Sequence, residues 1–253
     1  MKPNPALTAL LLASILALAG ACGISDESGS SASETTSAGA ASDEDESEPA
    51  DPETSDGEET NSTFVAEVWA DNWFALYANG ELVGEDSVPI TTERSFNAET
   101  ISFEAAYPLT IAIEAKDYIE TDMGLEYIGE PNQQMGDGGI IAQITDTASG
   151  EVVAVTSGEW SAFVVHRAPL NTECEGDADP EATCEFEIVD APAGWTAIGF
   201  DTSAWSPATV WTAADVDPKD GYDEIVWDTS AELVWGPDLE VDNTILLLTT
   251  INA

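Results

Sequence analysis

Short apolar, β-prone runs recur from Thr63 to the end of the chain, with polar residues between them. The runs 64–69 and 73–78 are separated by only three residues, and 109–115 alternates apolar with polar positions, as a strand with one buried face does. Further strands are predicted at 139–145, 151–156, 160–165, 225–227, 231–235 and 244–250. Since no window of a dozen residues has helical periodicity, the pattern predicts an all-β fold.

Turn residues between these runs favour antiparallel pairing. Asn79-Gly80 lies between two β-prone runs, and both residues tolerate the positive φ of a type I′ hairpin turn. Ala148-Ser149-Gly150 separates the next candidate pair in the same way. We therefore expect an antiparallel β-sandwich of the jelly-roll type over residues 63–253.

The beginning of the chain has a different character. Lys2 precedes an apolar run from Ala6 to Ala21, about the length of a signal-peptide core and short for a membrane span. The run ends in Leu18-Ala19-Gly20-Ala21-Cys22, which resembles the lipobox of bacterial lipoproteins, although Ala19 stands where that family usually has leucine. The resemblance implies a signal peptide over 1–21, a lipid on Cys22 and an exported, membrane-anchored protein of the cell envelope; an ordinary secretory signal is the alternative.

Residues 22–62 follow as a polar, acidic stretch without an aromatic residue. A segment with so little apolar surface cannot offset the entropy of ordering, so we expect a disordered linker. Its function would be to hold the folded domain away from the membrane, since the ends of a flexible chain of this length are about 35 Å apart. A cation-binding acidic tail is the alternative.

Charge narrows the range of partners. The chain carries 50 acidic and five basic residues, a formal charge of −45. Thirteen acids and Lys2 precede Thr63, so the domain has 37 acids against four bases and a charge of −33. Such a surface repels nucleic acid and anionic membrane, which excludes both as partners of the domain. It also indicates a saline habitat, in which counterions screen the repulsion.

The two cysteines after Cys22 predict a disulfide. Cys174 and Cys184 flank a polar loop in a chain expected to be exported, which favours one bond between them. A metal site is the weaker interpretation, because the single histidine, His166, lies elsewhere and no Cys-x-x-Cys is present.

Several segments together resemble a known domain family. They are ALYANGELVG at 75–84, LTIAIEA at 109–115, GGIIAQI at 138–144, Glu159-Trp160, and GFDTSAW at 199–205 with the preceding Gly194-Trp195. In this order they resemble galactose-binding-like domains, such as those at the N-termini of α-L-rhamnosidases and related glycosidases. Thr202 replaces the usual second aspartate, and the long insert between Ala168 and Pro192 departs from the family pattern. The resemblance implies a jelly roll that accompanies a catalytic domain rather than an enzyme, with Trp195 and Trp205 packed.

Calcium is the candidate ion, in a structural role; no cofactor is required. Calcium takes oxygen ligands from carboxylates, carbonyls and water. Asp217, Asp220 and Asp223 cluster around Gly221, but Lys219 and Gly221 break the order of an EF-hand loop. Solvated surface acids are the alternative.

A carbohydrate site is the leading functional hypothesis. Indole rings stack on sugars while Asp and Asn side chains bind their hydroxyls, and the turn at 69–73 combines both kinds of residue. The candidate binding residues are Trp69, Asp71, Asn72, Trp73 and Asn79. An aromatic core with ordinary turns is the alternative at these positions. A second functional hypothesis is a module that pairs with another envelope protein; catalytic motifs are absent from the sequence.

The charge generates the first prediction. Raising NaCl from low salt to about 1 M shortens the screening length to about 3 Å, from about 8 Å at 0.15 M, and so weakens the repulsion among the acids of the domain. The Tm of the full chain should therefore rise with NaCl in calorimetry. A flat response would contradict both the repulsion and the saline habitat inferred from it.

Overall fold

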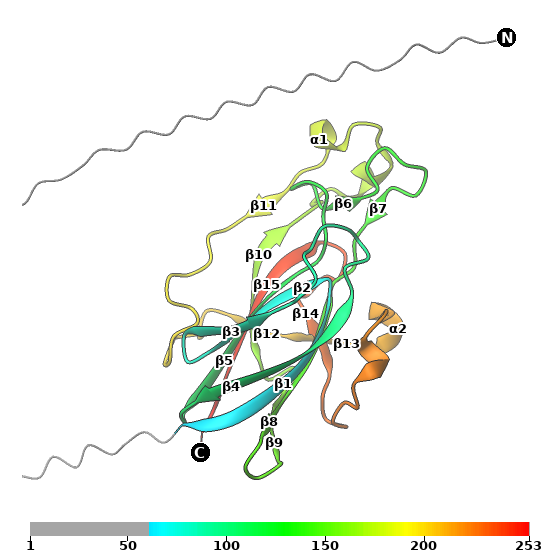
Figure 1. The fold of residues 1–253 in the computed structure, drawn as a ribbon. Helices are drawn as coiled ribbons and strands as arrows, with labels where there is room; N and C mark the ends of the chain where they lie inside the picture. The colour runs from blue at the N-terminus through cyan, green and yellow to red at the C-terminus, as the bar shows by residue number, and fades with distance from the viewer. Residues whose placement is uncertain (1–60, 253) are drawn as a thin grey trace, which may run out of the picture. The chain divides into compact units, whose positions relative to one another are not determined.

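The computed structural model describes residues 61–252. The predicted signal peptide, Cys22 and the linker up to residue 60 lie outside the described residues. The described part is an antiparallel β-sandwich, which confirms the predicted all-β class (Figure 1). The jelly-roll assignment within that class stays a prediction. No helix within residues 61–252 is long and apolar enough to cross a membrane.

The first sheet, sheet A, has its strands in the order β13-β14-β8-β1-β4, with β9 paired to β8. Every pairing is antiparallel, and β1 lies between β4 and β8 over nearly its whole length. The strands are β1 Ser62–Asp71, β4 Asn97–Ala105, β8 Gly139–Asp146, β9 Val152–Val155, β13 Thr209–Trp211 and β14 Leu233–Trp235.

The second sheet, sheet B, has the order β11-β10-β15-β5-β2-β3, with β12 paired to β10. Asn79 and Gly80 both have positive φ at the β2–β3 turn, as a type I′ hairpin requires. The strands are β2 Trp73–Ala78, β3 Glu81–Glu85, β5 Leu109–Lys116, β10 Ser161–Arg167, β11 Glu187–Ile188, β12 Ser206–Pro207 and β15 Asp242–Ile251. A small third sheet pairs β6 Leu125–Glu126 with β7 Gln134–Met135.

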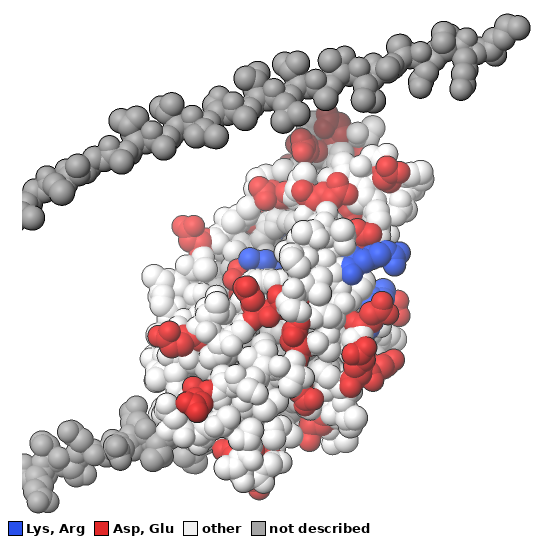
Figure 2. All heavy atoms as spheres, viewed as in Figure 1, with Lys and Arg blue, Asp and Glu red and all other residues white. Residues whose placement is uncertain are grey.

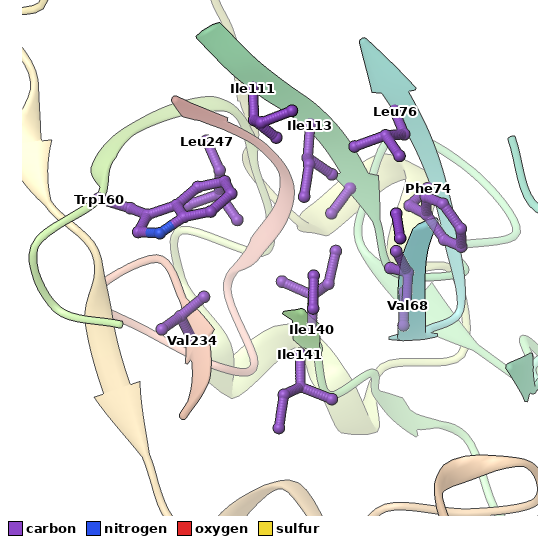
Figure 3. Packing of buried hydrophobic residues seen from close by; sticks show 14 of the residues in the cluster. Val68, Phe74, Leu76, Ile111, Ile113, Ile140, Ile141, Trp160, Val234 and Leu247 are labelled. Atoms are coloured by element: carbon purple, nitrogen blue, oxygen red, sulfur yellow. The ribbon is translucent and has the colours of Figure 1, made fainter. Parts of the chain in front are cut away.

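The hydrophobic core fills the space between sheets A and B (Figure 3). Val68 and Ile140 contribute from sheet A, and Phe74, Leu76 and Ile113 from sheet B; all five side chains are fully buried. Burial of such a side chain stabilises a fold by about 1.5–3 kcal/mol. Along β5 the residues of the core alternate with other positions, which is the pattern on which the strand prediction at 109–115 was based.

Part of the chain also covers the outer face of each sheet. Residues 189–207, here called the outer strap, cross sheet B, where Trp195 packs on Tyr77 at 5.6 Å and Trp205 on Phe163 at 5.4 Å. Residues 213–231, here called the outer cover, lie on sheet A and include α2 Ala213–Val216 and η2 Tyr222–Glu224. Both segments follow β11 in the chain (Figure 1). Trp195 and Trp205 are therefore packed, on the outside of the sandwich rather than between its sheets.

The structure differs from the sequence prediction at several elements, including the unpredicted short strands β6, β7, β11, β12 and β13. Residues 225–227 were predicted as a strand, but they are irregular because the outer cover has no strand to pair with there; Val226 is 92% exposed and Trp227 donates to the Tyr222 carbonyl. Conversely, β4 was missed, although Ile101, Phe103 and Ala105 alternate with polar residues along it.

The Cys174–Cys184 disulfide is present. It joins η1 Thr172–Gly176 to the end of α1 Pro180–Thr183, and both cysteines pack on Leu125 in a small cluster apart from the main core. The bond therefore connects the 172–184 loop to the β6–β7 hairpin through an apolar contact.

Replacing Cys184 with Ser should lower the free energy of unfolding by about 2–3 kcal/mol, because the bond closes a loop of ten residues and limits the unfolded chain. Urea denaturation of the wild-type and variant full chains measures the difference. Alkylation followed by intact-mass analysis should leave Cys174 and Cys184 unmodified until a reductant is added; labelling of both without reductant would contradict the bond.

Candidate binding site at the strand ends

A cavity of about 590 Å³ opens at the end of the sandwich where β1 finishes and β6 and β7 lie, and is here called the end cavity. Its lining mixes aromatic, amide, basic and acidic side chains. The residues that line it are Glu93, Arg94, Phe96, Glu126, Tyr127, Gln134, Met135, Gly136, Asp137, Glu175, Lys219, Asp220 and Glu240. The face shown in Figure 2 carries acidic side chains along its whole length and basic side chains at only a few places.

The chain crosses from sheet A to sheet B at this end through a single residue. Asp71 ends β1 in one sheet, Trp73 begins β2 in the other, and Asn72 lies between them. The Asn72 side chain donates to the Glu93 carbonyl at 3.1 Å and accepts from the Tyr118 amide at 2.6 Å. Its amide group is thus occupied by the backbone, so Asn72 holds the crossing together rather than offering a free group to a ligand.

Four acidic residues lie near one another at the end cavity and are here called the buried acids: Asp71 and Asp117 behind it, and Glu126 and the half-buried Asp137 in its lining. Asp71 is 2% exposed, and Asp117 and Glu126 are also buried. Burial raises the pKa of Asp71 and of Asp117 well above the usual range, and the neighbouring acids raise both further. Burial also raises the pKa of Glu126 to about 7 and increases the pKa of Asp137. Burial of unpaired carboxylates disfavours their charged forms.

Glycine at position 136 is required by the Asp117 carboxylate. A Cβ atom at Gly136 would lie 2.1 Å from Asp117 Oδ2, which is far inside contact distance. Asp117 follows β5, and its backbone amide donates to the Asn243 carbonyl on β15 at 3.0 Å. The segment leading into β8 is therefore held directly against this acid.

Two predicted sites meet at this end. Trp69, predicted to stack on a sugar, is fully buried, and this prediction is wrong for its indole because no face is open. The ring instead lies on the outer face of sheet A under the outer cover, packed edge-on against Tyr222 at 5.6 Å. Its Nε1 donates to the Asp220 carbonyl at 3.1 Å, so the predicted sugar turn and the predicted calcium loop contact each other.

The acids of the predicted calcium loop do not gather into a metal centre. Asp217 is exposed and pairs with Lys219 at 3.1 Å, Asp220 lines the end cavity, and Asp223 is exposed in η2. Within residues 61–252, no three His, Cys, Asp or Glu side chains are grouped so that they could hold a metal ion. The three acids point to different surroundings because the loop is shaped by its packing on Trp69.

Trp73 lies away from the end cavity, on the outer face of sheet B. Lys116 Nζ is 4.9 Å from the centroid of its ring, a cation–π contact. The ring lines a hollow of about 480 Å³, and Lys116 lines a neighbouring groove of about 380 Å³. Ile90 borders both, so Trp73 belongs to a second concave surface.

Asn79 is not part of either surface. It lies in the β2–β3 turn, where its side chain donates to the Ala106 carbonyl at 2.8 Å and accepts from the Thr110 amide at 2.7 Å. These bonds satisfy both ends of its amide group, so the role of Asn79 in this structure is to hold the hairpin. None of the five predicted binding residues lines the end cavity, but Asn72 and Trp69 hydrogen-bond the backbone of Glu93 and Asp220, which do line it.

Apart from Asp220, the residues that line the cavity were not among the predicted site residues. Arg94 and Tyr127 come from irregular segments and Gln134 from the two-residue strand β7, none of which has a periodic sequence pattern. One signal was available: Gly136, Gly138 and Gly139 surround Asp137, and such a density of glycine indicates close backbone approach. Tyr127 has a φ of +53°, an uncommon conformation for a non-glycine residue and one often found at functional sites.

Comparisons with known proteins identify no relative: no family model, no curated protein and no solved structure matches the chain.

The buried acids generate a pH prediction. Because the pKa of Glu126 in the folded state, about 7, lies above its unfolded value, the folded protein retains a proton that the unfolded chain loses. The contribution of Glu126 to stability should therefore fall as pH rises from about 4.5 to about 7 and then level off. The contribution of Glu126 is on the order of 2 kcal/mol.

Replacing Glu126 with Gln should remove that part of the pH dependence. Urea midpoints of both full chains, measured across this range with a chelator and at high salt, test the prediction. Replacement of the exposed Glu130 with Gln is the matched control and should leave the profile unchanged. A wild-type profile that rises with pH would contradict the burial of these acids.

Proposed function

We propose that this protein is a non-catalytic, carbohydrate-binding lipoprotein of the cell envelope, and that the glycan binds in the end cavity. The observation that supports the proposal is the combination of aromatic and hydrogen-bonding side chains in one open hollow. Phe96 and Tyr127 offer aromatic surface, while Arg94, Gln134 and Glu93 offer donors and acceptors within the same cavity. The volume of about 590 Å³ is within the range usual for small-ligand sites.

The charge of the cavity selects among glycans. Arg94 and Lys219 are the bases in its lining, against six acids: Glu93, Glu126, Asp137, Glu175, Asp220 and Glu240. Such a cavity repels sulfated and uronic-acid sugars. Neutral sugars and amino sugars are therefore the class that we propose.

The proposed anchor and linker fit a weak site. A single small cavity buries little area, so we expect a Kd on the order of 0.1–1 mM. A lipid on Cys22 would display many copies on one membrane, and the 22–62 linker would let neighbouring copies reach the same polysaccharide. Simultaneous binding then raises the overall affinity without new contacts.

Replacing Tyr127 with Ala should weaken glycan binding about tenfold, equivalent to about 1.4 kcal/mol, by removing aromatic surface from the cavity. An array of neutral, amino and acidic oligosaccharides identifies the ligand, and titration calorimetry of the wild-type and variant full chains measures the loss. Trp73→Ala is the matched control, since Trp73 lines the other concave surface. If Trp73→Ala weakens glycan binding and Tyr127→Ala does not, the glycan site lies on the outer face of sheet B instead.

A second candidate function, pairing with an envelope protein, is favoured by exposed apolar residues at the β2–β3 hairpin. Leu82 on β3 is 54% exposed and Ile198 in the outer strap is 55% exposed. The strap passes the hairpin closely, since a Cβ at Gly80 would lie 3.7 Å from Ala197 Cα. Two results together would favour this second function over carbohydrate binding. No glycan on the array would bind, and the chain would bind an envelope protein through a contact that Leu82→Asp abolishes.

A further inference from the structure

A buried carboxylate oxygen at the sandwich end has no hydrogen-bond partner. Asp71 Oδ2 is inaccessible to solvent and unpaired, in a residue that is 2% exposed. A second unpaired buried oxygen is the side-chain Oδ1 of Asn243 on β15. The backbone carbonyl of the same residue accepts a hydrogen bond from the Asp117 backbone amide. Native proteins leave few buried polar atoms unpaired, and each one requires an explanation such as an absent ion.

Asp71 lies where three parts of the chain converge. Asp71 pairs with Gly139 in the β1–β8 ladder, so the end of β1 lies beside the segment that contains Asp137. Gly136 in the same segment touches the Asp117 carboxylate. The backbone N–H of Asn72, which follows Asp71, donates to the backbone carbonyl of Lys116, which precedes Asp117. The ends of β1 and β5 and the approach to β8 therefore bring Asp71 and Asp117 to the same place.

The protein supplies too little positive charge there. None of the salt bridges within residues 61–252 includes Asp71, Asp117, Glu126 or Asp137. The cations near them are Arg94 and Lys219. Arg94 pairs with Glu93 at 3.7 Å, and the Lys219 ammonium group bonds the Asp217 carbonyl at 2.8 Å and the Asp217 carboxylate at 3.1 Å. An unpaired charge in a protein interior costs several kcal/mol, so a cation from solution would be strongly favoured.

We propose that Asp71 and Asp117 bind a calcium ion between the ends of β1 and β5. Calcium accepts about six to eight oxygen ligands in flexible geometry, so two carboxylates with backbone carbonyls and water suffice, and a grouping of three acids is not required. Asp137 and Glu126 line the adjoining end cavity and give the ion an acidic path from solvent. This site is distinct from the 217–223 loop and does not depend on the proposed function.

The donor chemistry favours calcium over other metals. Asp71 and Asp117 offer hard oxygen ligands, while the disulfide-bonded Cys174 and Cys184 have no free thiolate. His166 Nε2 is hydrogen-bonded to the Asp122 carbonyl at 2.9 Å. Zinc prefers nitrogen and sulfur ligands, and magnesium demands a near-ideal octahedron.

Calcium titration of the full chain in about 1 M NaCl tests the proposal, because general screening is already saturated at that salt concentration. Calorimetry should give one site, and Tm should rise by about 5 °C at calcium a hundredfold above Kd. Asp71→Asn should abolish both signals, because the neutral amide replaces a carboxylate ligand of the ion. Asp117→Asn should behave alike and serves if the first variant does not fold.

The double variant Asp217→Asn, Asp223→Asn is the matched control and should retain the full calcium response. Loss of the response in this control, with Asp71→Asn unaffected, would place the ion in the 217–223 loop and overturn the proposal. So would the absence of both heat and a Tm rise in the wild type. Glycan binding is measured separately with calcium and with chelator, so the failure of either proposal is recognised independently of the other.

Discussion

The one-residue crossing between the sheets at Asn72 is the constraint on which the rest of this end depends. A chain that leaves one sheet and enters the other without a loop has backbone groups that neither ladder satisfies. Asn72 supplies the missing partners by bonding the Glu93 carbonyl and the Tyr118 amide. These bonds bring the 91–95 loop and the segment after β5 to the crossing, and the loop supplies Glu93 and Arg94 to the wall of the end cavity. An aliphatic residue of similar size would leave the same backbone groups buried and unpaired.

The same geometry explains why acids are buried here. Asp71 and Asp117 occupy corresponding positions, each at the end of a central strand, so closure of the sandwich brings like charges together. Such an arrangement lowers stability, and proteins keep it where a bound group or a proton repays the cost. Gly136 strengthens the inference, because a backbone without a side chain is needed for the Asp117 carboxylate to fit.

The sheets were largely predictable from the sequence, and the site was only partly so. Alternation and the Asn79-Gly80 turn predict strands correctly because both are local signals, set by the period of the backbone and by allowed φ values. The burial of Trp69 could not be predicted, since it results from the outer cover, 151 residues further along the chain. The strand prediction at 225–227 was wrong because β-prone residues form a strand only where a neighbouring strand has an unpaired edge. The cavity residues come from irregular segments and from the two-residue strands β6 and β7, whose positions follow from tertiary contacts.

The outer cover and outer strap also have a consequence for folding during synthesis. β1 and β2 emerge early, but the segments that bury their outer aromatic residues, Trp69 and Tyr77, are made near the end of the chain. Until residues 189–231 arrive, both sheets have unprotected apolar surface, and β5 waits for its partner β15. Pairings of such sequence separation close slowly and leave time for aggregation. At this stage, before the end cavity has formed, the abundant acidic residues reduce aggregation, because their mutual repulsion keeps partly folded chains apart.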